Sequence, residues 1–167
     1  AYVYFREAII YMPKFKSAWV NLGILYRLNN YYAEAEQAYL YALNIDDDSL
    51  TAWENLAHLY SITGKTQDAQ VILARVERKR LLNPYYHLNL GERQFERKNW
   101  DEALSHFRRA LALDKRKHEV YFGLARVYFE IGELERSERF LRQAKLNAGN
   151  TSIGDAYQRK LNFLQDL

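Results

Sequence analysis

Cysteine is absent from this sequence of 167 residues, and only two prolines and seven glycines occur in it. Without a thiol the chain has no disulfide, no cysteine nucleophile and no thiolate metal ligand. Long apolar runs are missing as well: no stretch approaches the roughly 20 residues that cross a bilayer, and the first residues lack the pattern of a signal peptide. These absences are compatible with cytoplasm and periplasm alike, so the compartment stays open.

An excess of charge of one sign is also missing. The 24 basic and 21 acidic residues give a net charge of +3 and are mixed along the chain. A nucleic-acid binder more often carries a basic stripe, so no nucleic-acid partner is expected. A Gly-rich phosphate loop, G-x-S-x-G and H-E-x-x-H are absent too, and we therefore expect no catalytic residue, no metal site and no cofactor.

What the sequence has is a pattern that returns every 34 residues. It begins with Trp19, Leu22, Gly23 and Tyr26, spaced by three and four residues so that they share one face of a helix. Ala35 and Tyr39 follow on a second helix. The later copies, in the same order, are Trp53, Leu56, Ala57, Tyr60, Ala69 and Leu73; His87, Leu90, Gly91, Gln94, Ala103 and Phe107; and Tyr121, Leu124, Ala125, Tyr128, Ser137 and Leu141.

Self-similarity at this period, with W-x2-L-G-x2-Y and a later A-x3-aromatic, resembles the tetratricopeptide repeat (TPR) family over nearly the whole chain. The resemblance implies an all-α fold, a right-handed superhelical solenoid of helix-turn-helix repeats with a C-terminal capping helix. PPR and HAT arrays are helical hairpin repeats as well and often serve RNA, but the 34-residue spacing fits the TPR family better.

The repeat spacing predicts the boundaries of each unit. Asn29-Asn30, Gly64 and Gly132 are expected to end first helices, and Asn83 and Asn99 to cap helices at their start. The predicted units are the second helix of a truncated repeat at 1–15, four repeats at 16–49, 50–83, 84–117 and 118–151, and a capping helix at 152–167.

One polar position recurs beside the packing residues. Asn21, Asn55 and Asn89 occupy the same slot of three repeats, and Gly123 occupies it in the fourth. An Asn amide both donates and accepts, so a row of them can hold the backbone of an extended peptide. This row resembles the asparagine ladders of some TPR proteins. The alternative is that Asn is simply a polar residue on a wet helix face.

Other side chains are expected in the concave groove that the family forms with its first helices. The candidates for peptide binding besides the Asn row are Tyr85, Phe95, Phe122, Arg126 and Phe129, with Arg126 facing a ligand carboxylate. Equally, the Phe residues can pack between repeats. Further lining is expected from Val20, Ile24, Glu54, His58, Leu88 and Glu92, and from Lys160 and Phe163 of the last helix.

The resemblance implies a non-catalytic protein-protein interaction scaffold that binds an extended peptide or partner protein in this groove. A chaperone-tail receptor with a carboxylate clamp is disfavoured, because Val20 and Ile24 stand at its basic positions. Two alternatives stay open. The chain can be an accessory domain of a larger enzyme, or it can self-associate as a homo-oligomer through the apolar face of Phe5, Ile9 and Met12.

Overall fold

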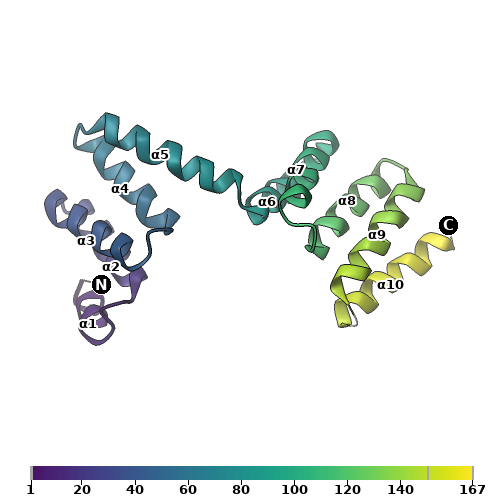
Figure 1. The fold of residues 1–167 in the computed structure, drawn as a ribbon, viewed down its shortest axis with the longest axis horizontal. Coiled ribbons are helices and arrows are strands. Elements are labelled where there is room, and N and C mark those ends of the chain that lie inside the picture. Colours follow the sequence, from purple (N-terminus) through teal and green to yellow (C-terminus); the bar gives the residue numbers. More distant parts are fainter. Residues whose placement is uncertain (1, 150, 167) are drawn as a thin grey trace. The chain divides into compact units, whose positions relative to one another are not determined.

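The computed structural model describes residues 2–149 and 151–166, which form ten α-helices and no strand (Figure 1). The all-α fold class is therefore confirmed. Ala1, Asn150 and Leu167, which the predicted repeat boundaries include, lie outside the described residues. The helices are α1 (Tyr2–Tyr11), α2 (Lys16–Leu28), α3 (Tyr32–Ile45), α4 (Leu50–Ile62), α5 (Thr66–Leu81), α6 (Pro84–Glu96), α7 (Trp100–Leu113), α8 (His118–Glu130), α9 (Leu134–Ala148) and α10 (Ser152–Gln165).

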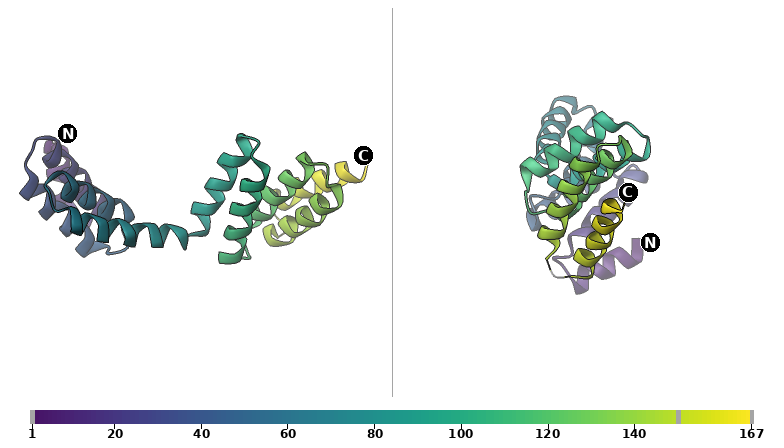
Figure 2. Two further views of the ribbon diagram at one scale, coloured as in Figure 1. Left: turned by 90° about the horizontal axis from the view of Figure 1, so that it is seen from above. Right: turned by 90° about the vertical axis from the view of Figure 1, so that its right-hand side faces the viewer.

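The chain divides into two compact units, Ala1–Lys79 and Arg80–Leu167. Within the first unit, α1 contacts α2, α2 contacts α3, and α3 contacts α4. Within the second, contacts run from α6 to α7, α8, α9 and α10 in succession, and α8, α9 and α10 lie side by side in each view (Figure 1; Figure 2). Within each unit, the helices named above therefore pack against the next one along the chain, the arrangement expected of helical hairpin repeats.

The turn inside each hairpin is made by one residue with a left-handed backbone. These residues are Asn30 (φ 62°), Gly64 (φ 83°), Lys98 (φ 59°) and Gly132 (φ 80°), spaced by 34 positions. Asn and Gly adopt this conformation readily, and the helix stops predicted at those residues are confirmed. Lys98 was not foreseen, because lysine has no preference for positive φ.

A side-chain donor at the first position of the repeat pattern closes the loop that precedes each first helix. Each of these side chains donates to the main-chain oxygen six residues earlier, and the donor changes from indole to imidazole to phenol. The pairs are Trp19 Nε1 to Pro13 O (2.8 Å), Trp53 Nε1 to Asp47 O (2.7 Å), His87 Nε2 to Leu81 O (3.1 Å) and Tyr121 Oη to Lys115 O (3.0 Å). The position therefore needs a ring that carries an N–H or O–H, which explains how His87 can replace Trp.

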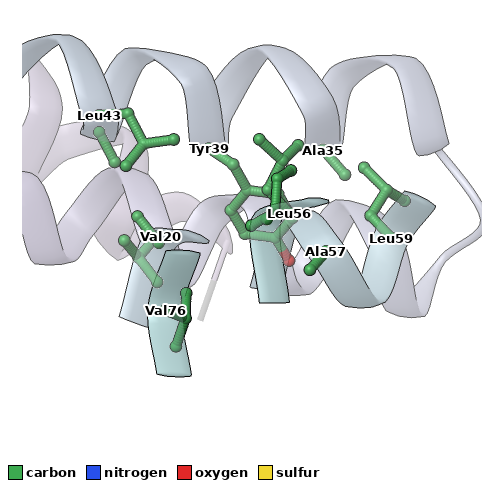
Figure 3. Packing of buried hydrophobic residues seen from close by; sticks show 11 residues of the cluster. Val20, Ala35, Tyr39, Leu43, Leu56, Ala57, Leu59 and Val76 are labelled. Carbon is green, nitrogen blue, oxygen red and sulfur yellow. The ribbon is translucent and has the colours of Figure 1, made fainter. Parts of the chain in front are cut away.

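Tyr39 lies at the centre of the apolar core of the first unit, among Leu43, Leu56 and Ala57 (Figure 3). Its ring is fully buried and presses on α2 so closely that a Cβ added at Gly23 would stand 2.5 Å from its Cε1. Only glycine fits at such an approach. The Leu-Gly pair of the repeat pattern is thus the complement of the aromatic residue 16 positions later.

Phe107 has the same role in the second unit, and it acts on two helices. A Cβ added at Gly91 of α6 would stand 2.6 Å from its Cδ1 and Cε1, and one added at Gly123 of α8 would stand 2.6 Å from its Cε1. The ring is fully buried. It therefore fills the space between the first helices of two successive hairpins, and both helices need glycine where they meet it.

The two predicted Asn caps behave differently. Asn83 accepts a hydrogen bond from the N–H of Tyr85 at 2.9 Å, with Pro84 at the first helical position, so this cap is confirmed. The cap predicted at Asn99 is wrong in its chemistry: its side chain makes no capping bond, and its Nδ2 donates to Gln94 Oε1 at 2.9 Å. The amide of Asn99 joins the turn to the end of α6 instead.

Candidate functional site

A pocket of about 360 Å³ opens in the second unit, with walls from α6, α8, α9 and α10. Four phenylalanines and two cations characterise it. Its lining residues are Phe95, Phe122, Ala125, Arg126, Phe129, Glu130, Ser137, Leu141, Lys160, Phe163 and Leu164. Four of the eight predicted binding residues, namely Phe95, Phe122, Arg126 and Phe129, therefore come together here.

The repeat spacing explains why these side chains meet. Phe95, Phe129 and Phe163 follow one another at intervals of 34 residues on α6, α8 and α10. Equivalent positions of stacked repeats point in the same direction, so the three rings form one row along the pocket. Phe129 and Phe163 are 39% and 57% exposed, which leaves apolar surface open to solvent.

A row of charged residues runs beside the Phe row. Glu92, Arg126 and Lys160 are likewise 34 residues apart and lie one helical turn before the three phenylalanines. The Nη1 of Arg126 donates to Glu92 Oε2 at 2.8 Å. From the sequence, Arg126 was predicted to bind a ligand carboxylate. In the structure it forms an ion pair with Glu92 of the neighbouring first helix.

The two cations are held against the aromatic walls. The guanidinium of Arg126 lies 3.9 Å from the centroid of Phe95 and 5.6 Å from that of Phe122. Lys160 Nζ lies 5.5 Å from the same Phe122 ring. Cations over aromatic faces are attracted by about 0.5–1 kcal/mol at exposed sites, so both charges stay at the pocket.

Tyr157 packs against Phe122, one of the pocket-lining residues. Its ring packs against Phe122 with centroids 5.1 Å apart, and its hydroxyl lies 3.0 Å from Nδ1 of His118. Burial raises the pKa of Tyr157, and the negative charge of Glu119 raises it further. The hydroxyl therefore remains protonated at neutral pH, and Phe122 packs against the core cluster that contains Tyr157.

The three Asn residues of the predicted row differ in exposure and in hydrogen bonding. Asn21 on α2 and Asn89 on α6 are exposed, while Asn55 on α4 is half-buried and its Nδ2 donates to Thr51 O at 2.8 Å. Asn21 and Asn55 belong to the first unit and Asn89 to the second. The row stops at Gly123 for a steric reason, because the ring of Phe107 occupies the space of any side chain there.

Tyr85 is not brought to the Phe pocket. It stands at the start of α6, ten residues before Phe95 and so about 15 Å away along the helix. Its hydroxyl is hydrogen-bonded to Lys117 Nζ, which also lies 4.2 Å from the ring centroid. Tyr85 therefore holds the turn before α8 and is a separate, 48% exposed surface residue.

Two further residues expected in the groove are involved in the core of the first unit. Val20 is 5% exposed and belongs to the cluster around Tyr39, and Ile24 packs against that cluster. The burial of Val20 corrects the prediction that it lines the groove, whereas Ile24 is only partly buried and its place in the groove stays a prediction. By contrast, Lys160 and Phe163 do line the Phe pocket, and a count of 34 residues from Arg126 and Phe129 finds both.

Within residues 2–149 and 151–166, no cluster of three or more His, Asp or Glu side chains could hold a metal ion. None of the helices in the same ranges combines the length and apolarity that crossing a membrane requires.

Family models described as "Tetratricopeptide repeat" match residues 17–49, 54–116 and 94–161. The chain belongs to the tetratricopeptide repeat family. Together the three matches cover most of the sequence, and they agree with the helical hairpins and the 34-residue spacing. The family and the fold support a protein-interaction scaffold in general, and TPR modules are typically non-catalytic.

Several curated proteins contain similar TPR segments. Residues of this chain are 25% identical over 142 positions to Superkiller protein 3 of Schizosaccharomyces pombe, and 28% identical over 136 positions to Protein bimA of Emericella nidulans. These matches cover 80% and 78% of the chain but 10% and 16% of those proteins. A shorter match, 39% identical over 56 positions, covers 34% of the chain and 6% of Protein O-mannosyl-transferase TMTC3 of Mus musculus. The chain therefore spans a small part of each relative's length.

Solved TPR structures share the fold at low sequence identity. The crystal structure of the APC/C hetero-tetramer Cut9-Hcn1 is similar with a TM-score of 0.50 and 20% identity, covering 97% of this chain and 33% of that one. A tetratricopeptide repeat protein from Parabacteroides merdae gives a TM-score of 0.50 and 21% identity, covering 99% and 66%. At this identity the likeness shows the fold alone.

Proposed function

We propose that this TPR chain is a non-catalytic scaffold that binds an extended peptide or a partner protein in the groove lined by the first helices of its repeats. The observation that supports the proposal is the pocket of the second unit, where Phe95, Phe122, Phe129 and Arg126 line one cavity. Aromatic residues, phenylalanine included, and arginine are enriched at protein interfaces. Such a pocket suits an apolar side chain that anchors a longer segment.

The size and chemistry of the pocket favour an anchor side chain over a whole small-molecule ligand. Its volume of about 360 Å³ lies near the lower end of the roughly 300–1,000 Å³ found for ligand sites. The polar groups on its rim are long charged side chains, which adapt to a peptide. Asn89, exposed on the same α6 helix as Phe95, offers a donor and an acceptor for the peptide backbone.

The test is a peptide-library selection on the full 167-residue chain, repeated on Phe129→Ala with its fold checked by circular dichroism. Removing this ring, which is 39% exposed, removes part of the anchor site, and hot-spot truncations weaken binding by about 2 kcal/mol or more. The matched control is Leu113→Ala, because Leu113 lies in the same unit, is 37% exposed and does not line the pocket. Equal binding by all three proteins would reject the pocket as the binding site.

The Asn row is tested separately with the Asn21→Ala, Asn55→Ala, Asn89→Ala triple variant. Within either unit, a peptide backbone held by the Asn amides should bind the variant more weakly, by roughly 0.5–1.5 kcal/mol for each net hydrogen bond lost. Unchanged affinity would mean that these residues are ordinary polar surface.

A second candidate is an accessory TPR domain within a larger enzyme. It is favoured by one observation, the 39% identity over 56 positions to a protein named as an O-mannosyl-transferase. The full open reading frame that encodes this chain separates the candidates, because only the second requires a catalytic domain in the same polypeptide.

A further inference from the structure

The Phe row and the charged row together form a patterned surface on α6, α8 and α10. In the described part of the second unit, Phe129 makes no ring-stacking or cation contact, and the ring contact of Lys160 is with Phe122. Phe95 differs, since Arg126 covers its face and Trp100 packs on its edge with centroids 5.3 Å apart. The open end of the surface is therefore the α8–α10 end.

Only one pair of the charged residues around that open end forms an ion pair among the residues that the structure describes. Arg126 is paired with Glu92, and Glu130 lies at the pocket edge. Lys160 has no ion-pair partner among the residues that the structure describes, and it stands over Phe122 next to Arg126. Arg126 uses Nη1 for Glu92, and a guanidinium has five N–H donors. Both cations therefore keep donors for a further acceptor.

The distance between the two rows sets where such an acceptor must be. Arg126 precedes Phe129 by three residues, and Lys160 precedes Phe163 by three, so the Cβ atoms within each pair are about 5–6 Å apart on one helix face. An extended chain advances about 3.3 Å per residue. A ligand carboxylate that reaches a cation would thus come from a residue one or two positions away from the apolar anchor.

We infer that this pocket selects an extended acidic segment of a partner protein, in which a large apolar side chain enters between Phe129 and Phe163 and an Asp or Glu one or two residues away binds Lys160 and Arg126. The inference rests on the proposed function of the groove and adds the chemistry of its ligand. It assigns a binding role to Lys160 and Phe163. It also assigns a positioning role to Glu92, whose ion pair with Arg126 orients the guanidinium over Phe95 before the ligand carboxylate binds.

The experiment is a random-peptide display selection on the full chain and on Lys160→Glu, followed by affinity measurement on the enriched peptides. We expect the parent to enrich an apolar residue with Asp or Glu one or two positions away. Lys160→Glu should retain the apolar residue, lose the acidic one and gain Lys or Arg. A peptide selected by the parent should bind Lys160→Glu at least tenfold more weakly, and its acid-to-amide version should lose affinity for the parent but little for the variant.

Arg159→Glu is the matched control, because it makes the same change of net charge one residue away on α10 and does not line the Phe pocket. It should behave like the parent, apart from a small loss that disappears when salt screens long-range charge.

The outcomes separate the inference from the function on which it rests. Enriched peptides without a nearby acidic residue, or equal binding by Lys160→Glu, would overturn the acidic-segment inference and leave the proposed groove intact. Failure to enrich any peptide, or equal enrichment by Phe129→Ala, would overturn the proposed function itself. Self-association that Phe129→Ala abolishes in sedimentation would show that a second copy of the chain occupies the pocket, and would also overturn the inference.

Discussion

His87 donates its Nε2–H to the main-chain oxygen of Leu81 at 3.1 Å, in the place where the two preceding repeats use a tryptophan. A carbonyl oxygen can only accept, so the tautomer must carry its proton on Nε2. The ring is 2% exposed, and its Nδ1 has no hydrogen-bond partner among the described residues. One buried histidine thus satisfies a loop carbonyl and leaves its own second nitrogen unsatisfied.

Replacing this donor tests whether the hydrogen bond or the ring volume matters more. His87→Phe removes the donor and leaves the Leu81 oxygen unsatisfied, a loss of about 1–3 kcal/mol that is reduced because the orphaned Nδ1 also disappears. His87→Ala loses ring volume as well and should be clearly worse. Urea unfolding followed by the fluorescence of Trp100, the tryptophan of this unit, measures both, and equal stability of His87→Phe and the parent would show that the bond contributes nothing net.

The contact of Phe107 with Gly123 predicts a strong coupling between these positions. Gly123→Ala places a Cβ 2.6 Å from the Phe107 ring, and overpacking of this kind costs about 1–3 kcal/mol, although alanine is the better helix former by about 1 kcal/mol. Phe107→Leu alone creates a cavity. The double variant should be more stable than the sum of the two changes predicts, because leucine vacates the space that the added methyl group needs.

A double-mutant cycle on the unfolding free energy measures that coupling. Additive effects would contradict the steric account of why the Asn row ends at Gly123.

Lys98→Gly is expected to stabilise the second unit. Lys98 has φ 59° in the turn between α6 and α7, and a left-handed backbone costs roughly 1–2 kcal/mol for a residue with a Cβ. Glycine removes this strain but has more freedom in the unfolded chain, so a net gain of about 0.5–1 kcal/mol should appear in urea unfolding.

The neighbouring Arg97→Gly is the control for this change. Arg97 has φ −83° and carries no such strain, so glycine there should only destabilise. A loss of stability at both positions would refute the prediction.

Glu36 gives the first unit a defined dependence on pH. Its carboxylate accepts hydrogen bonds from Tyr60 Oη at 2.7 Å and Lys65 Nζ at 2.9 Å. Burial acts to raise the pKa of Glu36, but the bonds from Tyr60 and Lys65 outweigh it and hold that pKa below its ordinary value of 4.5. The folded state then favours the charged form, so the stabilisation is complete above pH 4.5 and is lost as pH falls through the lowered pKa.

Comparison of the parent with Glu36→Gln isolates this contribution. The difference in unfolding free energy should be constant near neutral pH and should shrink toward zero as the solution becomes more acidic than pH 4.5. Glu34→Gln, at an exposed position of the same helix, is the control that makes the same chemical change. Burial, and after it the hydrogen bond to Glu36, raises the pKa of Tyr60 to about 12. The unit should therefore also lose stability between about pH 10 and 12.

The repeat spacing predicted those features of the fold and the pocket in which residues 34 positions apart have the same role. Trp19, Trp53 and Tyr121 made the family recognisable, and the same count places Lys160 and Phe163 beside Arg126 and Phe129. The ion pair of Glu92 with Arg126 follows the rule too, since opposite charges stand at one slot of neighbouring repeats.

What the spacing could not predict depends on contacts particular to one repeat. Val20 occupies the slot of Phe122, yet it is buried while Phe122 lines the pocket. Asn55 shares its slot with Asn21 but bonds its own helix through Thr51. Lys98 adopts a turn conformation that its side chain does not favour, because the geometry of the hairpin outweighs the preference of a single residue.

The ring of Phe107, shared by Gly91 and Gly123, has a consequence for how the second unit opens. In a repeat array, stability depends on each hairpin and on the interface with its neighbour. Phe107 contributes both to the stability of its own hairpin and to the interface with the next one. If α7 separates from α6, the contact of Phe107 with α8 is therefore lost as well. Amide protons of α6, α7 and α8 should therefore exchange in a single concerted opening, so that the lifetime of the Phe pocket on α8 is set by a residue that does not line it.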